Sequence, residues 1–78
     1  MTEKIAFIGA GNMARSLVGG MLRHGAPATS IVAADPVVDQ RTGMAALGIT
    51  TTDVNAQAID GAAIIVLAVK PQALRAVV

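Results

Sequence analysis

Hydrophobic and polar residues are arranged along the chain in blocks that predict strands separated by helices. The first block is the run from Ile5 to Ile8, four apolar residues that lead directly into a glycine pair. Beyond the glycines, apolar residues recur at helical spacing, at Ala14, Leu17, Val18, Met21 and Leu22. A short unbroken apolar run followed by this spacing predicts a buried strand, a tight turn and the start of a helix.

The end of this first helix is marked by His24-Gly25 and by Pro27 shortly after. Glycine favours helix C-termini, and proline cannot continue a helix. Arg23 and His24 fall in the last turn, where the helix dipole favours positive charge. His24 has no Ser, Cys or carboxylate neighbour in the sequence, so its place at a helix end explains it better than acid–base catalysis.

The second block is the run from Ile31 to Ala34, which predicts another buried strand ended by Asp35-Pro36. Asp before Pro is also typical of a helix start, with Asp as the N-cap and Pro as the first helical residue. A second helix is predicted over Val37–Leu47 and is closed by Gly48. Gly43 lies inside it at a cost of roughly 1 kcal/mol relative to Ala.

The next segment predicts shorter elements. Ile49–Thr51 indicates an edge strand, and Thr52–Asn55 carries turn and capping residues before a short helix through Ile59. Asp60-Gly61 ends that helix. On local grounds Asn55 is a cap or turn residue.

The last apolar run, Ala63–Val69, does not alternate with polar residues, so we expect a central parallel strand covered on both faces. Lys70 follows it, and Pro71 can open a further helix at its first position. The spacing of Leu74, Val77 and Val78 fits the buried face of that helix.

Strands and helices therefore alternate, which predicts an α/β fold of the Rossmann type. Right-handed crossovers give a doubly wound parallel sheet with strand order 3-2-1-4. Of the 78 residues 54% are hydrophobic, and Phe7 is the single aromatic residue, so the core must consist of aliphatic side chains. Such a sheet needs helices on both faces, and the chain hardly has enough of them. We expect residues 1–78 to be one truncated domain, the N-terminal part of a larger protein.

Charge and composition exclude several classes of function. The net charge of +1 is spread over single residues, which argues against nucleic-acid and membrane-surface binding. The chain has no cysteine, hence no thiolate metal site, and we predict no metal. The longest apolar run, Ala62 to Val69, is too short to span a bilayer, and Met1–Lys4 does not resemble a signal peptide. We therefore expect a cytoplasmic protein.

The glycine pair carries the clearest chemical signal. Gly9, Gly11 and Ala14 occupy the small positions of a G-x-G-x-x-A motif between a strand and a helix. In a dinucleotide-binding unit the first glycine permits the turn, the second lets a pyrophosphate approach the backbone, and the third small residue brings the helix close to the strand. The helix N-terminus offers free N–H groups to the anion. Glycine pairs also make ordinary turns, but this context favours a nucleotide.

Two further residues have both a functional and a structural interpretation. Asp35 lies about 20 residues beyond the glycine motif, where a ribose-binding carboxylate is expected, but it can also cap the helix that follows. Lys70 would stand at the carboxyl end of the last strand, where ligands of open α/β sheets bind, or would be a solvated surface lysine.

Several motifs together resemble one family, pyrroline-5-carboxylate reductase. The residues that carry the resemblance are Phe7–Ala14, Asp35-Pro36, Asn55 within Thr52–Asn55, and Ala68–Gln72. The resemblance covers all 78 residues. It is fairly specific when the first and last motifs are taken together, although the glycine motif alone occurs in many dehydrogenases.

The resemblance implies an NAD(P)-binding domain followed by a helical domain that forms the homo-oligomer and most of the substrate pocket. The pyrophosphate would be bound by Ile8, Gly9, Ala10, Gly11, Asn12 and Met13. Ala34 and Asp35 would face the adenosine ribose, and Asn55 would also touch the cofactor. Ala68, Val69, Lys70 and Pro71 would lie along the nicotinamide. The implied reaction reduces the C=N bond of 1-pyrroline-5-carboxylate to L-proline with NADPH or NADH.

This chain departs from the family at one point. Family members often prefer NADPH and carry small hydroxyl residues where this chain has Ala34 and Asp35. A carboxylate beside a 2′-phosphate is repulsive unless Asp35 turns away or Arg41 compensates. On sequence grounds Asp35 is thus predicted to set the balance between the two cofactors.

The isolated chain is expected to have no reductase activity of its own. Two other functions remain open. A 2-hydroxyacid or arogenate-type dehydrogenase could share this fold and turn. A non-catalytic NAD(P)-sensing module is an alternative of a different class. No residue of the chain is predicted to be catalytic.

Overall fold

The computed structural model describes residues 3–68, and the predicted features at Val69–Val78 lie outside them. The elements are β1 (Ile5–Ile8), α1 (Asn12–Arg23), the 3-10 turn η1 (Ala28–Ser30), β2 (Ile31–Ala34), α2 (Val38–Ala45), β3 (Thr50–Thr52), α3 (Asn55–Ile59) and β4 (Ile64–Leu67). The predicted alternation of strands and helices is confirmed. The short turn η1 is an addition that the sequence patterns did not indicate.

The four strands form one parallel sheet in the order β3-β2-β1-β4, as predicted. Phe7 of β1 lies between Ala33 of β2 and Val66 of β4. Successive side chains of a strand point to opposite faces, so Phe7 faces one layer of helices and its neighbours Ala6 and Ile8 face the other.

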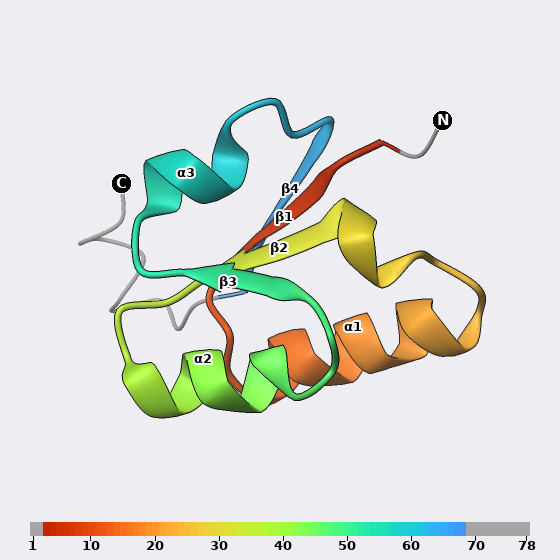
Figure 1. Cartoon of the computed structure of the whole chain (residues 1–78), viewed down its shortest axis with the longest axis horizontal. Helices are drawn as coiled ribbons and strands as arrows, with labels where there is room; N and C mark the ends of the chain where they lie inside the picture. The colour runs from red at the N-terminus through yellow and green to blue at the C-terminus, as the bar shows by residue number, and fades with distance from the viewer. Residues whose placement is uncertain (1–2, 69–78) are drawn as a thin grey trace.

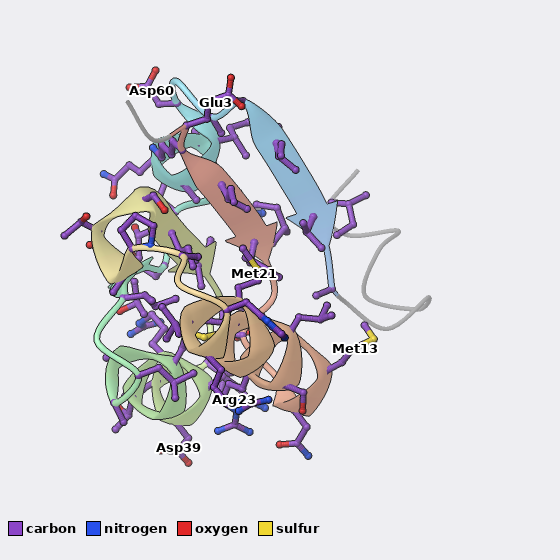
Figure 2. The ribbon with its side chains drawn as sticks, turned by 90° about the vertical axis from the view of Figure 1, so that its right-hand side faces the viewer. Glu3, Met13, Met21, Arg23, Asp39 and Asp60 are labelled. Carbon is purple, nitrogen blue, oxygen red and sulfur yellow. The ribbon has the colours of Figure 1, made fainter. Side chains whose placement is uncertain are left out.

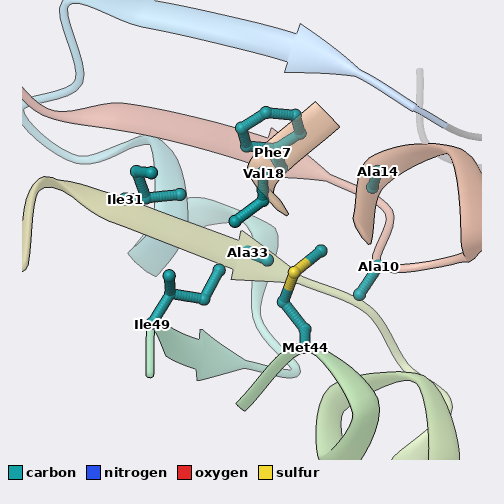
Figure 3. Packing of buried hydrophobic residues seen from close by; sticks show 8 residues of the cluster. All are labelled: Phe7, Ala10, Ala14, Val18, Ile31, Ala33, Met44 and Ile49. Atoms are coloured by element: carbon teal, nitrogen blue, oxygen red, sulfur yellow. The ribbon is translucent and has the colours of Figure 1, made fainter. Parts of the chain in front are cut away.

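The sheet is covered by α1 and α2 on one face and by α3 on the other (Figure 1). Figure 3 shows the larger core, between the sheet and the first two helices, which contains Phe7, Ala10, Ala14, Val18, Ile31, Ala33, Met44 and Ile49. The smaller core under α3 contains Ala6, Ile8, Ala34 and Ala58. Small side chains on this second face let the short helix α3 lie close to the strands.

The carbonyl groups at the end of α3 are bound by a side chain from the start of the chain. Lys4 Nζ donates to the carbonyl oxygen of Asp60 at 2.6 Å and to that of Gln57 at 3.3 Å. A cation near a helix C-terminus is favoured by the exposed carbonyls and the helix dipole. This contact ties α3 to the beginning of β1.

Two predictions about helices are wrong in detail. The second helix starts at Val38 with Val37 as its N-cap, so Asp35 is not the cap and Pro36 is not the first helical residue. Asp35 Oδ1 instead accepts a hydrogen bond from the N–H of Val37 at 2.8 Å, a local turn typical of Asp. Asn55 is the first residue of α3, whose N-cap is Val54, and α3 has no side-chain cap.

The prediction that the last strand is covered on both faces is also wrong for residues 3–68. There β4 is one of the two edge strands of the sheet, and Ile64, Ile65 and Leu67 are each about half exposed, at 49%, 49% and 53%. Only Val66 packs against the larger core. The continuous apolar run correctly indicated a strand, but burial depends on what lies beside it.

Candidate functional site

The carboxyl ends of the four strands meet at one edge of the sheet (Figure 1), and the candidate site is formed there by the loops after β1, β2 and β3 together with Ala68 after β4. Hydrogen bonds beyond the strands hold these loops together. The N–H of Gly9 donates to the carbonyl of Ala34 at 2.7 Å, and that of Ala68 donates to Ile8 at 2.8 Å. The turn after β1 is therefore fixed between the ends of β2 and β4.

The two glycines of this turn have different reasons to be glycine. Gly9 has φ of +108°, a backbone conformation that side chains disfavour. Gly11 has φ of −78° and would tolerate a side chain, but a Cβ built there meets no atom within 4 Å and would occupy open space in front of α1. That space is where an approaching phosphate would need access to the backbone.

The start of α1 is suited to bind an anion. Gly11 is its N-cap, no side chain caps its first N–H groups, and its first turn carries no acidic residue. Ala14 is fully buried, which lets the helix lie against the strands. Free N–H groups and the positive end of the helix dipole favour a phosphate here. The local geometry fits the pyrophosphate of a dinucleotide.

Asp35 lies at this edge, and its carboxylate is engaged by the backbone. Oδ2 accepts from the N–H of Ala10 at 2.9 Å, and Oδ1 accepts from the N–H of Val37. Ala10 belongs to the glycine turn and is fully buried. The carboxylate therefore holds the turn after β1 to the end of β2, a contact that the sequence did not indicate.

Two arginines lie near the same edge. Arg41 Nη1 donates to the carbonyl of Asp35 at 2.9 Å. Arg15 donates to Asn12 Oδ1 at the first turn of α1 and packs over Gly43 of α2. Positively charged side chains therefore lie near the end of β2 and the start of α1, where they suit a ligand that carries phosphates.

The remaining predicted residues lie at different places along this edge. Asn55 is half-buried at the start of α3, directly after β3. Met13 projects from the start of α1 and is 58% exposed, whereas Met21 turns towards the sheet (Figure 2). Ala68 is fixed beside the turn by its bond to Ile8. Val69, Lys70 and Pro71 lie outside the described residues.

Sequence reasoning missed three apolar side chains at this edge. Val37 and Val38 follow β2, Val54 follows β3, and they are 51%, 61% and 41% exposed. Exposed valines at the starts of α2 and α3, beside a nucleotide turn, suit a flat apolar ring such as adenine. The sequence showed them as apolar, but their exposure depends on where α2 and α3 begin.

The carboxylate of Asp35 at this edge is bound on both oxygens by backbone N–H groups. His24 is exposed at the far end of α1, as its C-cap. The same residues contain no cluster of His, Cys, Asp and Glu suited to hold a metal ion. In this part of the chain no helix has both the length and the hydropathy that crossing a bilayer requires.

Comparisons with known proteins agree with this geometry. The model of the family "NADP oxidoreductase coenzyme F420-dependent" matches residues 4–78. Curated relatives include pyrroline-5-carboxylate reductases from Pseudomonas aeruginosa, 51% identical over 77 residues, and from Vibrio alginolyticus, 48% identical over 71 residues. These matches cover 97% and 90% of this chain but only 28% and 26% of the relatives.

A solved structure gives the same picture. A pyrroline-5-carboxylate reductase from Coxiella burnetii superposes with a TM-score of 0.92 at 36% identity, over 99% of this chain and 29% of the other. The predicted resemblance to pyrroline-5-carboxylate reductases and the predicted cofactor class, NADP(H) or NAD(H), are thereby confirmed. With the family model matching nearly its whole length, the chain belongs to the NADP-linked oxidoreductase family that this model describes.

Proposed function

We propose that the full-length protein reduces 1-pyrroline-5-carboxylate to L-proline with NADPH or NADH, and that residues 1–78 are its cofactor-binding Rossmann domain. The observation that carries the proposal is the uncapped start of α1 behind Gly11, in a chain 51% identical to a pyrroline-5-carboxylate reductase. The family description also mentions coenzyme F420, but the relatives compared above are all named pyrroline-5-carboxylate reductase.

The proposed roles of the individual residues come from the resemblance, and for the residues up to Ala68 their places at the sheet edge support them. The turn Ile8–Met13 would bind the pyrophosphate through backbone N–H groups, and Ala34 and Asp35 would face the adenosine ribose. Asn55 would contact the cofactor from the start of α3. The nicotinamide would lie beside Ala68–Pro71. The two ends of the cofactor would thus lie on opposite sides of the turn.

The chemistry is a hydride transfer. When bound, the reduced nicotinamide would supply a hydride for the carbon of the C=N bond, and the nitrogen would take a proton from solvent. The role of residues 3–68 would be to bind the cofactor and to orient it. We further propose that a helical domain after this one completes the substrate pocket and forms a homo-oligomer, and that the protein is cytoplasmic.

A substrate panel tests the proposal. The full-length protein is assayed with pyrroline-5-carboxylate, a 2-keto acid and a 3-oxo acid by the loss of NAD(P)H absorbance, with the isolated residues 1–78 as the inactive control. Turnover of pyrroline-5-carboxylate is expected. Turnover of a keto acid alone would identify a hydroxyacid dehydrogenase, and cofactor binding without turnover of any substrate would identify a sensing module.

A further inference from the structure

Two polar side chains occupy the first turn of α1, directly after the glycine turn. Asn12 is the first residue of the helix and is exposed, and Arg15 is half-buried one turn further along. The side chains of a helix lean towards its N-terminus. The amide of Asn12 therefore lies beside the N–H groups at the start of α1, which no side chain caps.

A hydrogen bond between these two residues fixes how the amide is turned. Arg15 Nη2 donates to Asn12 Oδ1. A guanidinium can only donate, so the atom of the amide that faces it must be the oxygen. The Nδ2 group, which carries two N–H donors, then lies on the other side of the amide, and within residues 3–68 it donates to no other group.

Arg15 is itself held against α2. Its guanidinium packs over Gly43, where an added Cβ would lie only 3.2 Å from Arg15 Cζ. A side chain at position 43 would therefore displace the guanidinium from this place. The absence of a side chain in α2 thus allows Arg15 to reach the amide of Asn12 from the side of α1 that faces α2.

The backbone of the glycine turn offers fewer free donors than its sequence suggests. The N–H of Gly9 donates to the carbonyl of Ala34, and that of Ala10 donates to the carboxylate of Asp35. Neither is free for a phosphate on the turn. The first turn of α1 also contains no acidic residue that would compete for the donors of Asn12. A side-chain amide here adds donors at the place where an anion would bind.

We propose that Asn12 donates through Nδ2 to the pyrophosphate of the cofactor, and that Arg15 is the positioning residue that turns the amide towards it. The proposal deepens the proposed function and rests on it only for the use of a nicotinamide dinucleotide. Arg15 acts through Asn12 rather than on the phosphate itself, and Gly43 gives it the room to do so.

Binding of NADPH to the full-length protein, measured by fluorescence titration, tests this without any turnover. In Asn12→Ala the affinity should fall about tenfold or more, because a hydrogen bond to a charged group is lost. Arg15→Met keeps an unbranched side chain over Gly43 but removes the donor. It should lower the affinity about threefold, since the released amide is distributed over three staggered rotamers.

A double-mutant cycle separates positioning from direct binding. In an Asn12→Ala background, Arg15→Met should cause no further loss of affinity, because no amide remains to be oriented. Arg23→Met is the matched control: it makes the same change at an exposed arginine in the last turn of α1 and should leave the affinity unchanged. Urea denaturation shows whether each variant is as stable as the parent.

Asn12→Asp provides a second measurement that does not depend on a loss of folding. The carboxylate keeps an acceptor for Arg15 and suits the start of a helix, so the fold should be at least as stable. It replaces the two donors with a negative charge, and NADPH affinity should fall at least about fivefold below that of Asn12→Ala.

Several results would overturn the proposal. Equal losses from Arg15→Met with and without the Asn12 amide would show that Arg15 binds the cofactor directly. Normal NADPH affinity in Asn12→Ala, Arg15→Met or Asn12→Asp would also refute it. The substrate panel is separate: NADPH binding without turnover of pyrroline-5-carboxylate would refute the proposed function and leave these binding results standing.

Discussion

At the scale of single residues, Gly9 and Gly11 are two positions apart but constrained by different forces. Gly9 is required by its own backbone, which has a positive φ of 108°. Gly11 has an ordinary negative φ, and nothing lies near its absent side chain. A substitution at Gly11 therefore tests ligand binding separately from folding.

Gly11→Val is expected to abolish cofactor binding while the fold survives. The valine side chain would enter the space in front of the N–H groups of α1, where the pyrophosphate must lie. We expect NADPH affinity to fall at least about a hundredfold, since the main anion contact is removed. The measurement is a fluorescence titration of NADPH with the full-length protein.

Gly19→Ala is the matched control for that variant. It also adds a side chain to α1, but a Cβ there meets Arg23 Nη1 at an ordinary 3.5 Å, away from the turn. It should bind NADPH normally and be slightly more stable, because Ala favours a helix over Gly. Normal titration by a folded Gly11→Val protein would contradict the assignment of the turn.

Asp35→Ser should weaken both cofactors by the same factor. Serine is too short to replace the bond to Ala10, so a buried N–H loses its acceptor and the turn after β1 loosens. Loss of such a partner costs about 1–3 kcal/mol. We expect a lower free energy of unfolding in urea and an unchanged ratio of NADPH to NADH affinities. A ratio shifted towards NADPH would instead support the prediction from the sequence that Asp35 sets the balance between the cofactors.

At the scale of elements, the glycine inside α2 is explained by its neighbour in α1. From the sequence, Gly43 was an unexplained cost to the second helix. The structure places the Arg15 side chain over it, and a Cβ at Gly43 would lie only 3.2 Å from Arg15 Cζ. The missing side chain thus gives room for a contact between α1 and α2.

A double-mutant cycle tests this contact. In an Arg15→Ala background, Gly43→Ala should raise the free energy of unfolding by about 0.5–1 kcal/mol, the usual gain of Ala over Gly in a helix. With Arg15 present the gain should be smaller, since the new methyl group displaces the guanidinium. Urea denaturation of the four proteins provides the values. Equal gains in both backgrounds would show that the two residues are not coupled.

At the scale of the whole molecule, the strands of the described part of the chain differ in how well helices cover them. Helices pack against β1 and β2, whereas β4 exposes apolar side chains on both faces of the sheet. Ile65 and Leu67 pair with Ala6 and Ile8, which places them on the face covered by α3. Exposed apolar surface of this kind favours association.

Residues 1–78 as an isolated polypeptide are therefore expected to self-associate. Replacing Ile65 and Leu67 with Thr, which keeps β-propensity, should shift the polypeptide towards monomer in sedimentation velocity without loss of the sheet. Val66→Thr is the control: Val66 packs against the larger core, so this change should lower stability and leave the open face in place. An unchanged sedimentation profile of the double variant would rule out this face as the contact.

The sequence by itself determined the order of the elements, the strand order and the position of the turn after β1. These features depend on local patterns: unbroken apolar runs, helical spacing, and glycines at a strand–helix joint. Right-handed crossovers leave few arrangements of parallel strands, and the glycine motif favours the Rossmann order among them. The run Ile31–Ala34, for example, was located to the residue because turn residues bound it on both sides.

Only the tertiary structure decided what each polar side chain at the site contacts and which apolar side chains are exposed. The bond from Ala10 to Asp35 joins residues 25 positions apart, and no local pattern encodes it. The exposure of Ile64 and the packing of Arg15 over Gly43 depend likewise on which elements lie side by side. The periodicity of apolar residues shows which face of a helix or strand is apolar. Which other element packs against that face depends on the packing of the whole chain.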